Sequence, residues 1–216
     1  MTNNETLQLI ELYKRESSNV FNGLSDRSIA TFVKMIVYAY NNESTVYACG
    51  NGGNVAAVGN LVVDLNMHPF VSEDKSSQNT DRNNFHCVNL SSCPATLTGI
   101  SNDLGFEHIF SEQLRYQAKE GDLFFGISGS GNSKNVINAL EYSKENNMKT
   151  IIITRNAECK AKDLADLMIV VEGDSTFPGQ TGKNNNNFHF EDCISKVTHI
   201  AVGVLKQEVS NEVTSE

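Results

Sequence analysis

The fold of this chain is decided by the stretch Leu123-Phe124-Phe125-Gly126-Ile127-Ser128-Gly129-Ser130-Gly131-Asn132-Ser133. Its apolar first half predicts a buried strand, its second half predicts a turn of small residues, and a helix is expected from Lys134. Helix N-termini leave backbone N–H groups without acceptors and attract anions. The hydroxyl groups of Ser128, Ser130 and Ser133 add donors, so the stretch predicts a phosphate-binding loop. A Ser/Gly linker, the alternative, does not account for the flanking strand and helix.

A second unit of the same kind lies earlier in the chain. Residues 45–49 are rich in β-forming side chains, a glycine turn (residues 50–54) follows, and residues 55–65 predict a helix. The turn does not match the G-x-G-x-x-G fingerprint and lacks the downstream acidic residue of dinucleotide sites. Cys49 is expected to be a small buried hydrophobic residue, because no neighbouring base or cation would activate its thiol.

Strands and helices alternate along the rest of the chain. Strands are expected over 85–90, 123–127, 149–154 and 167–171, and helices over 95–100, 106–118, 134–145 and 161–165. This alternation, without hairpin signals, predicts an α/β fold with a parallel, doubly wound sheet. Both small-residue turns follow strands, so we expect them at the carboxyl edge, where such sheets bind ligands.

Long helices are expected at both ends of the chain. Residues 5–22 and 26–40 predict a helical hairpin within residues 1–43, with Ser25 and Asp26 capping its second helix, and residues 188–209 predict a closing helix. These helices carry more apolar surface than one face of a sheet needs. We therefore expect part of that surface to be buried against another subunit.

Two long polar segments interrupt the pattern. Residues 67–84 are expected to be a mobile loop, with a lid over the ligand as the alternative. Residues 173–187 form the second loop, and the asparagine run over 184–187 predicts low-complexity disorder. The sequence assigns no role to either segment.

Composition limits the partners of the chain. Its 216 residues fit one domain over 1–216, with 39% hydrophobic and 20% charged residues. A net charge of −9 argues against a nucleic-acid or anionic-membrane surface, although a local nest of N–H groups can still hold a phosphate. Five scattered cysteines without C-x-x-C spacing predict a reducing, cytoplasmic setting. No signal-peptide core or bilayer-spanning run is found in the sequence.

Three motifs together resemble the sugar isomerase (SIS) domain, and within it the phosphoheptose isomerase branch. They are Cys-Gly-Asn-Gly-Gly at 49–53, Ser-Asn-Asp-Leu-Gly-Phe at 101–106 and Ile-Ser-Gly-Ser-Gly-Asn-Ser at 127–133, and the resemblance covers nearly the whole chain. It implies a flavodoxin-like αβα sandwich and a homotetramer with sites between subunits. It also implies isomerisation of sedoheptulose 7-phosphate to an aldoheptose 7-phosphate, with zinc in many members.

The resemblance also implies a set of ligand contacts. Ser128, Gly129, Ser130 and Ser133 would hold the sugar phosphate. The residues that would contact the sugar are Asn51, Gly52, Gly53, Asn102 and Asp103. All of these positions match the motifs of the branch.

The catalytic and metal positions implied by the resemblance are changed in this chain. Where the family has histidine, glutamate, glutamine and histidine, this sequence has Asn60, Asp64, Glu191 and His199. Asn60 replaces an imidazole by an amide, a poor zinc ligand, and Asp64 draws its carboxylate back by one methylene. Asp64, Glu191 and His199 could hold a divalent ion or act as a metal-free acid–base set. Ordinary polar helix residues are the alternative for all but His199.

Three functions are compatible with these residues. The first is an aldose–ketose isomerase that works through an enediol, with Asp64 or Glu191 as base and His199 as proton shuttle. The second is a non-catalytic phosphosugar-binding or assembly protein, favoured by the changes at Asn60, Asp64 and Glu191. The third is a nucleotide-binding protein of flavodoxin-like fold.

Overall fold

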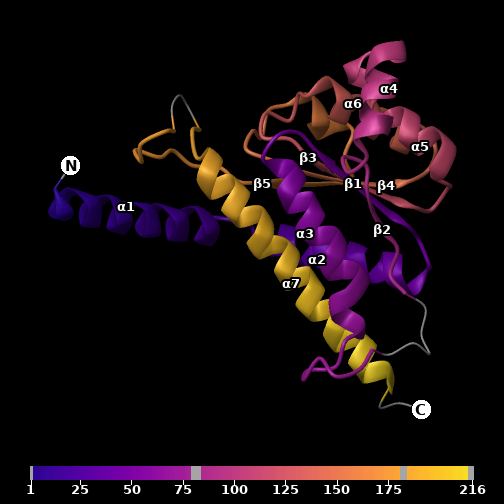
Figure 1. The fold of residues 1–216 in the computed structure, drawn as a ribbon, viewed down its shortest axis with the longest axis horizontal. Coiled ribbons are helices and arrows are strands. Elements are labelled where there is room, and N and C mark those ends of the chain that lie inside the picture. Colours follow the sequence, from indigo (N-terminus) through magenta and orange to yellow (C-terminus); the bar gives the residue numbers. More distant parts are fainter. Residues whose placement is uncertain (1, 79–83, 181–183, 214–216) are drawn as a thin grey trace.

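Five parallel strands form the central sheet of the computed structural model, which describes residues 2–78, 84–180 and 184–213 (Figure 1). The strands are β1 (Val46–Gly50), β2 (Cys87–Asn89), β3 (Leu123–Ile127), β4 (Lys149–Thr154) and β5 (Leu167–Val170). Their order across the sheet is β2-β1-β3-β4-β5. This is the flavodoxin-like order, in which the chain changes direction between β1 and β3. The predicted parallel, doubly wound sheet is confirmed.

Helices cover both faces of the sheet and separate two apolar clusters. One face packs on α2 (Asp26–Asn41), α3 (Asn54–Met67) and α7 (Asn187–Val213). The other face packs on α5 (Ser111–Gln117) and α6 (Lys134–Glu145). Successive residues of a strand point to opposite faces, so Phe124 belongs to the second cluster and Phe125 to the first. Continuous apolar strands such as β3 are what a sheet covered on both faces requires.

The two N-terminal helices form close to their predicted bounds, with α1 beginning two residues earlier, but do not pair with each other. Ser25 accepts a hydrogen bond from the N–H of Ser28 and caps α2, as the sequence predicts. The first helix, α1 (Asn3–Asn22), packs mainly on α7 and extends away from the sheet (Figure 1). The predicted helical hairpin is therefore corrected to two helices at an open angle. The anchor of α1 is polar, which apolar periodicity cannot predict.

The segment over residues 67–84 is more ordered at its start than predicted. It opens with a 3₁₀ turn, η1 (His68–Phe70), in which Pro69 and Phe70 are buried. The Phe70 ring lies 5.9 Å from that of Tyr40 on α2. The sequence did not predict this aromatic contact, because the residues after Phe70 are mostly polar. Residues 79–83 lie outside the described residues, so the expected mobility of that part is not addressed.

Four further expectations need correction. The helix expected over 106–118 is divided into η2 (Phe106–His108) and α5, with the buried residues Ile109 and Phe110 between them. The helix expected over 161–165 is a 3₁₀ turn, η3 (Lys160–Asp163), and α4 (Pro94–Leu104) is longer than predicted. The asparagine run is ordered where it is described, since the side chain of Asn186 is buried and donates to the Val171 carbonyl.

Membrane-spanning helices are not found among the described residues, because none of their helices is both long and apolar enough.

Candidate functional site

The glycine turn and the serine loop (residues 128–133) meet at the carboxyl edge of the sheet. Gly50 and Ile127, the last residues of β1 and β3, are register partners. The side-chain amides of Asn51 and Asn135 then exchange two hydrogen bonds, of 3.0 Å and 2.9 Å. Asn135 is buried in the first turn of α6, and the sequence alone did not single it out. This reciprocal pair holds the two ligand-suited turns together at the switch point of the sheet.

The serine loop has the donors of an anion site. The hydroxyl oxygens of Ser128 and Ser133 lie 3.0 Å apart, so two of the three predicted hydroxyl groups converge. Within the described residues, the backbone N–H groups of Gly129, Ser130 and Ser133 have no acceptor. Unpaired N–H groups that precede a helix form a nest for an anion. Ser130 is exposed, and its hydroxyl oxygen accepts the N–H of Asn132 at 3.2 Å.

Glu191 lies against the glycine turn. A Cβ atom on Gly53 would be only 2.7 Å from Oε1 of Glu191, so the carboxylate lies directly against this glycine. Asn187 donates to the same oxygen at 3.3 Å. Gly52 has a φ of +58°, a conformation that glycine adopts without strain. The predicted sugar contacts Gly52 and Gly53 are therefore joined by Glu191 from α7.

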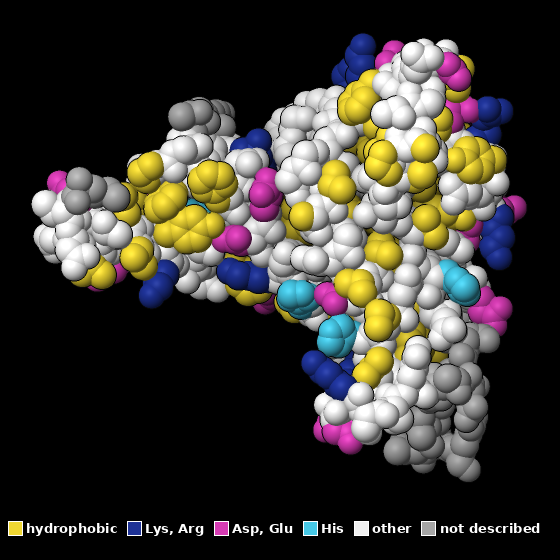
Figure 2. Space-filling model, viewed as in Figure 1, with side chains coloured by type: hydrophobic (Ala, Val, Ile, Leu, Met, Phe, Trp, Pro, Cys, Tyr) yellow, Lys and Arg dark blue, Asp and Glu magenta, His cyan; other side chains and the backbone are white. Residues whose placement is uncertain are grey.

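Asp64 and His199, two of the residues predicted to be catalytic, are in contact. Oδ2 of Asp64 on α3 lies 3.4 Å from Nε2 of His199 on α7. On the other side of the carboxylate, Oδ1 lies 3.7 Å from Nε2 of His68. On the face shown in Figure 2, two histidine side chains flank an acidic one over these helices. The sequence placed residue 68 only within the loop expected over 67–84, although the position of His68 four residues after Asp64 was an available signal.

The predicted metal ligands are not brought together within one chain. Glu191 and His199 lie eight residues apart on α7, which is about 12 Å at 1.5 Å per residue. Among the described residues, no three His, Cys, Asp or Glu side chains are placed to hold a metal ion. Asn60 is exposed and offers an amide oxygen, a poor ligand for zinc. The donor set of a single chain therefore does not fit the zinc site that the resemblance implies.

Asn102 and Asp103 bond to each other. Both are exposed near the end of α4, where Asn102 donates to Asp103 at 2.8 Å. In the part of the chain that the structure describes, neither bonds to the serine loop or to the glycine turn. Their predicted contact with the sugar stays a prediction.

Cys49 is excluded as a nucleophile by its surroundings. Its side chain is fully buried, and burial raises the pKa of the thiol well above its ordinary value. A thiol that stays protonated is a poor nucleophile. The prediction that Cys49 is a small hydrophobic residue is confirmed.

Comparisons with known proteins agree with this geometry. The SIS domain family matches residues 13–155, more than half of the chain. Phosphoheptose isomerase of Helicobacter pylori (strain P12) is 31% identical over 144 residues, covering 67% of this chain and 70% of that protein. Phosphoheptose isomerase of Aliarcobacter butzleri (strain RM4018) is 34% identical over 143 residues, covering 66% and 71%. The solved structure of phosphoheptose isomerase from Neisseria gonorrhoeae shares the fold, with a TM-score of 0.77, 22% identity, and coverage of 95% of this chain and 100% of that one.

Proposed function

The chain belongs to the SIS domain family, and we propose that it is an aldose–ketose isomerase for a phosphorylated sugar, of the phosphoheptose isomerase type. The observation that carries this proposal is the contact between Asp64 and His199. A carboxylate and an imidazole in contact supply the base and the proton shuttle that an enediol reaction needs. The unpaired N–H groups of the serine loop supply the phosphate site.

The spacing along α3 supports a site completed between subunits. Asp64 lies eleven residues beyond Gly53, about 16 Å along the helix axis. The six carbon–carbon bonds of a heptose, about 1.5 Å each, give it a reach of at most roughly 9 Å. A sugar phosphate held at the carboxyl edge therefore does not extend to Asp64 of the same chain. We assign the serine loop of one copy and the Asp64–His199 pair of another copy to each site.

The proposed reaction moves one proton between adjacent carbons. The Asp64 carboxylate removes the proton from the hydroxyl-bearing carbon next to the carbonyl, and the freed electron pair forms the enediol double bond. His199 protonates the former carbonyl oxygen and takes up the proton of the neighbouring hydroxyl group. Asp64 then returns its proton to the former carbonyl carbon, which leaves the isomeric sugar. Each proton returns, so no oxidant or other co-reactant is consumed.

His68 is assigned a positioning role in this reaction. Its Nε2 lies 3.7 Å from the carboxylate oxygen that does not face His199. Contacts on both oxygens limit rotation of the Asp64 side chain, and a general base must be held in line with the proton it removes. Glu191, at the glycine turn, is assigned to accept hydrogen bonds from sugar hydroxyl groups.

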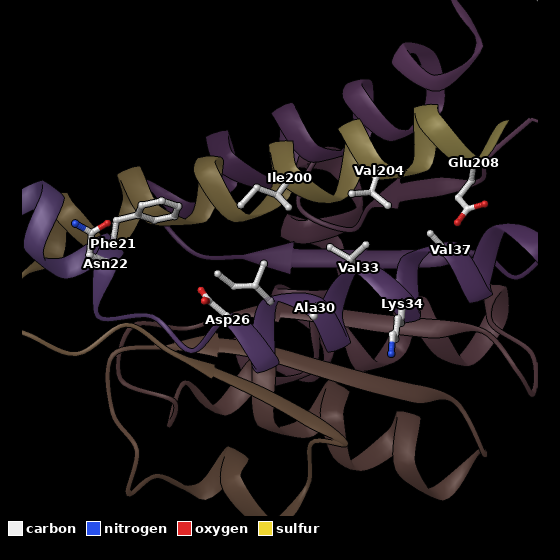
Figure 3. A pocket seen from close by; sticks show the side chains of 11 residues that line it. Phe21, Asn22, Asp26, Ala30, Val33, Lys34, Val37, Ile200, Val204 and Glu208 are labelled. Atoms are coloured by element: carbon white, nitrogen blue, oxygen red, sulfur yellow. The ribbon is translucent and has the colours of Figure 1, made fainter. Parts of the chain in front are cut away.

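A homotetramer is the proposed assembly, and two features of the surface support self-association. The first is α1, which stands away from the sheet with Leu7 and Ile10 exposed (Figure 1). The second is the α2–α7 groove, of about 800 Å³, in which Ile200 and Val204 of α7 face Val33 of α2 (Figure 3). Exposed apolar surface of this extent is typical of protein–protein contacts. We also place the reaction in a reducing cytoplasm, since all five cysteines are unpaired.

The activity is tested by turnover of sedoheptulose 7-phosphate and other ketose phosphates, with and without divalent metals. Asp64→Asn is expected to lower kcat at least roughly a hundredfold while leaving the dissociation constant of the sugar phosphate unchanged, because it removes only the base. The control is Asp163→Asn, which changes an exposed carboxyl group on η3. Absence of turnover by the unmodified protein on every substrate would reject the proposal.

A second candidate, a phosphosugar-binding protein without turnover, is favoured by Asn60. The resemblance requires an imidazole at this position, and the chain has an exposed amide. Tight binding of sugar phosphates without any isomerisation would select this candidate over the first.

A further inference from the structure

Arg155 stands at the edge of the serine loop, in a pocket that the sequence did not predict. It follows β4 directly and lines a cavity of about 650 Å³ together with Gly129 and Ser130. The other walls carry the acidic residues Glu158, Glu172 and Asp174, and the remaining lining residues are Asn156, Ala157, Gly173 and Asn184. Arg155 is thus the one basic residue among the described residues that line this cavity.

The backbone and side chain of Arg155 are fixed by several contacts. Its N–H donates to the Gly129 carbonyl at 3.1 Å. Nη1 donates to the Asn184 carbonyl at 3.2 Å, and the side-chain amide of Asn184 donates to the Arg155 carbonyl. The guanidinium carbon lies 6.0 Å from the centre of the Phe190 ring on α7, within the range of a cation–π contact. A group held in this way is already in position before a ligand arrives.

The charge of Arg155 has no counterion in the described part of the chain. Despite three carboxylates in the same cavity, no ion pair joins any of them to Arg155. Nε is buried without a hydrogen-bond partner, and Nη2 has none among the described residues. A partly buried cation without a counterion loses hydration free energy that an anionic ligand would restore.

The guanidinium lies directly against the serine loop. A Cβ atom on Gly129 would be 3.1 Å from Nε and 3.3 Å from Nη2, so the glycine leaves room for the arginine. The loop itself carries no basic side chain from Ser128 to Ser133. Its N–H groups supply only partial charges, whereas a phosphate monoester carries close to two negative charges at pH 7.

We propose that Arg155 is a further binding residue of this site and contacts the phosphate monoester held by the serine loop. This role rests on the proposed function in taking a sugar phosphate as the ligand, but it does not depend on turnover. The carboxylates of Glu158, Glu172 and Asp174 would repel a second anionic group in the same cavity. The ligand class is therefore a monophosphate whose remaining groups are uncharged.

The test is equilibrium binding of inorganic phosphate and of sedoheptulose 7-phosphate, measured by calorimetry on the full chain. Arg155→Gln is expected to lower the affinity for both ligands by the same factor, about 10- to 100-fold, because one charge-assisted contact is lost. Arg155→Lys keeps the charge but not the forked geometry, so it is expected to lose less affinity than Arg155→Gln. The control is Lys149→Gln, which removes the same charge from the opposite end of β4.

Two results would overturn the assignment. The first is wild-type affinity for inorganic phosphate in both Arg155 variants, or no phosphate binding by the unmodified chain. The second is weaker binding of the sugar phosphate with unchanged binding of inorganic phosphate, which would mean that Arg155 contacts the sugar. If Arg155→Gln does not fold, Arg155→Lys decides, since unchanged phosphate affinity would contradict the forked contact. Failure of the isomerase proposal alone would give another result: turnover would be absent, while Arg155→Gln would still weaken the binding of phosphate.

Discussion

Gly131 is the residue at which the serine loop depends most on the absence of a side chain. Its φ is +64°, in the left-handed region that other residues enter at a cost of about 1–2 kcal/mol. A Cβ atom there would also lie 2.7 Å from Cβ of Cys159 and closer still to its Sγ. Because Ser128 and Ser133 flank this position, any shift of Gly131 moves the hydroxyl groups that converge on the anion nest.

Gly131→Ala is therefore expected to reduce both stability and phosphate affinity. Left-handed strain and overpacking against Cys159 together should lower the free energy of unfolding by about 2–4 kcal/mol. Phosphate affinity should fall in the fraction that remains folded. Urea unfolding and calorimetric titration with inorganic phosphate measure the two effects.

The matched control is Gly203→Ala on α7. A Cβ atom at Gly203 meets nothing within 4 Å, and the residue is exposed in a helix. Alanine should stabilise the helix there by roughly 0.5–1 kcal/mol. Wild-type phosphate affinity in Gly131→Ala would show that the loop conformation does not depend on this glycine.

Residue patterns predicted the loops of the site but not the contacts that complete it. The small residues over 128–133 are read directly from the chain, because the anion nest is local in sequence. The partners of Asn51 and Asp64 are not all local. Asn135 reaches Asn51 across 84 positions, and Arg155 meets Gly129 only because β3 and β4 are neighbours. No spacing rule finds such pairs before the order of the strands is known.

Among the elements, α1 is attached in part through the carboxylate of Glu16. Glu16 accepts hydrogen bonds from Ser175, from the N–H and hydroxyl of Thr176 at 3.0 and 2.9 Å, and contacts buried His189 at 3.2 Å. Burial opposes ionisation of this carboxyl group. The hydrogen bonds from Ser175, Thr176 and His189 more than offset that effect and lower the pKa of Glu16 to about 2.

Glu16→Gln is expected to remove a pH-dependent part of the stability. A lowered folded-state pKa means that this contribution is complete above the ordinary value of 4.5 and is lost as the pH falls towards 2. The difference in unfolding free energy between wild type and variant should be of the order of 2 kcal/mol at pH 6 and shrink towards pH 2. Urea unfolding at several pH values measures it.

Glu11→Gln, on an exposed position of the same helix, is the control for this prediction. It removes the same charge from α1 without removing an acceptor that bonds to the segment over residues 175–176. A constant difference between Glu16→Gln and wild type over the whole pH range would contradict the prediction.

Elements with strong local signals were predicted well, and those fixed by distant contacts were not. The β-branched run of β4 and the cap of α2 give bounds close to those observed. The direction of α1 is different, because it is set by Glu16 and by the bond from Tyr13 to Asp192, 179 positions away. Amphipathic periodicity predicts that α1 is a helix but does not predict the direction of its axis.

At the scale of the whole molecule, the glycine turn and the Asp64–His199 contact lie farther apart along α3 than a sugar reaches. The separation along α3 is about 16 Å between Gly53 and Asp64. Two copies related by symmetry can bring the serine loop of one to the Asp64–His199 pair of the other. Catalysis should then require contributions from two chains.

Mixing of inactive subunits tests this requirement. One variant carries Ser128→Ala and Ser133→Ala in the serine loop, the other carries Asp64→Asn, and each alone should be inactive. After unfolding and joint refolding in equal amounts, random pairing should give about a quarter of the sites an intact loop and an intact Asp64. About a quarter of wild-type kcat should therefore return, measured on sedoheptulose 7-phosphate.

The control mixture joins Asp64→Asn with His199→Ala, which damage the same side of the site, since the two side chains are in contact within one chain. Under shared sites this mixture regains no activity, because each pair then keeps at least one defect. If sites were built within single chains, neither mixture would recover. Recovery in the first mixture and not in the second therefore requires that each site combine the serine loop of one copy with the acid–base pair of its neighbour.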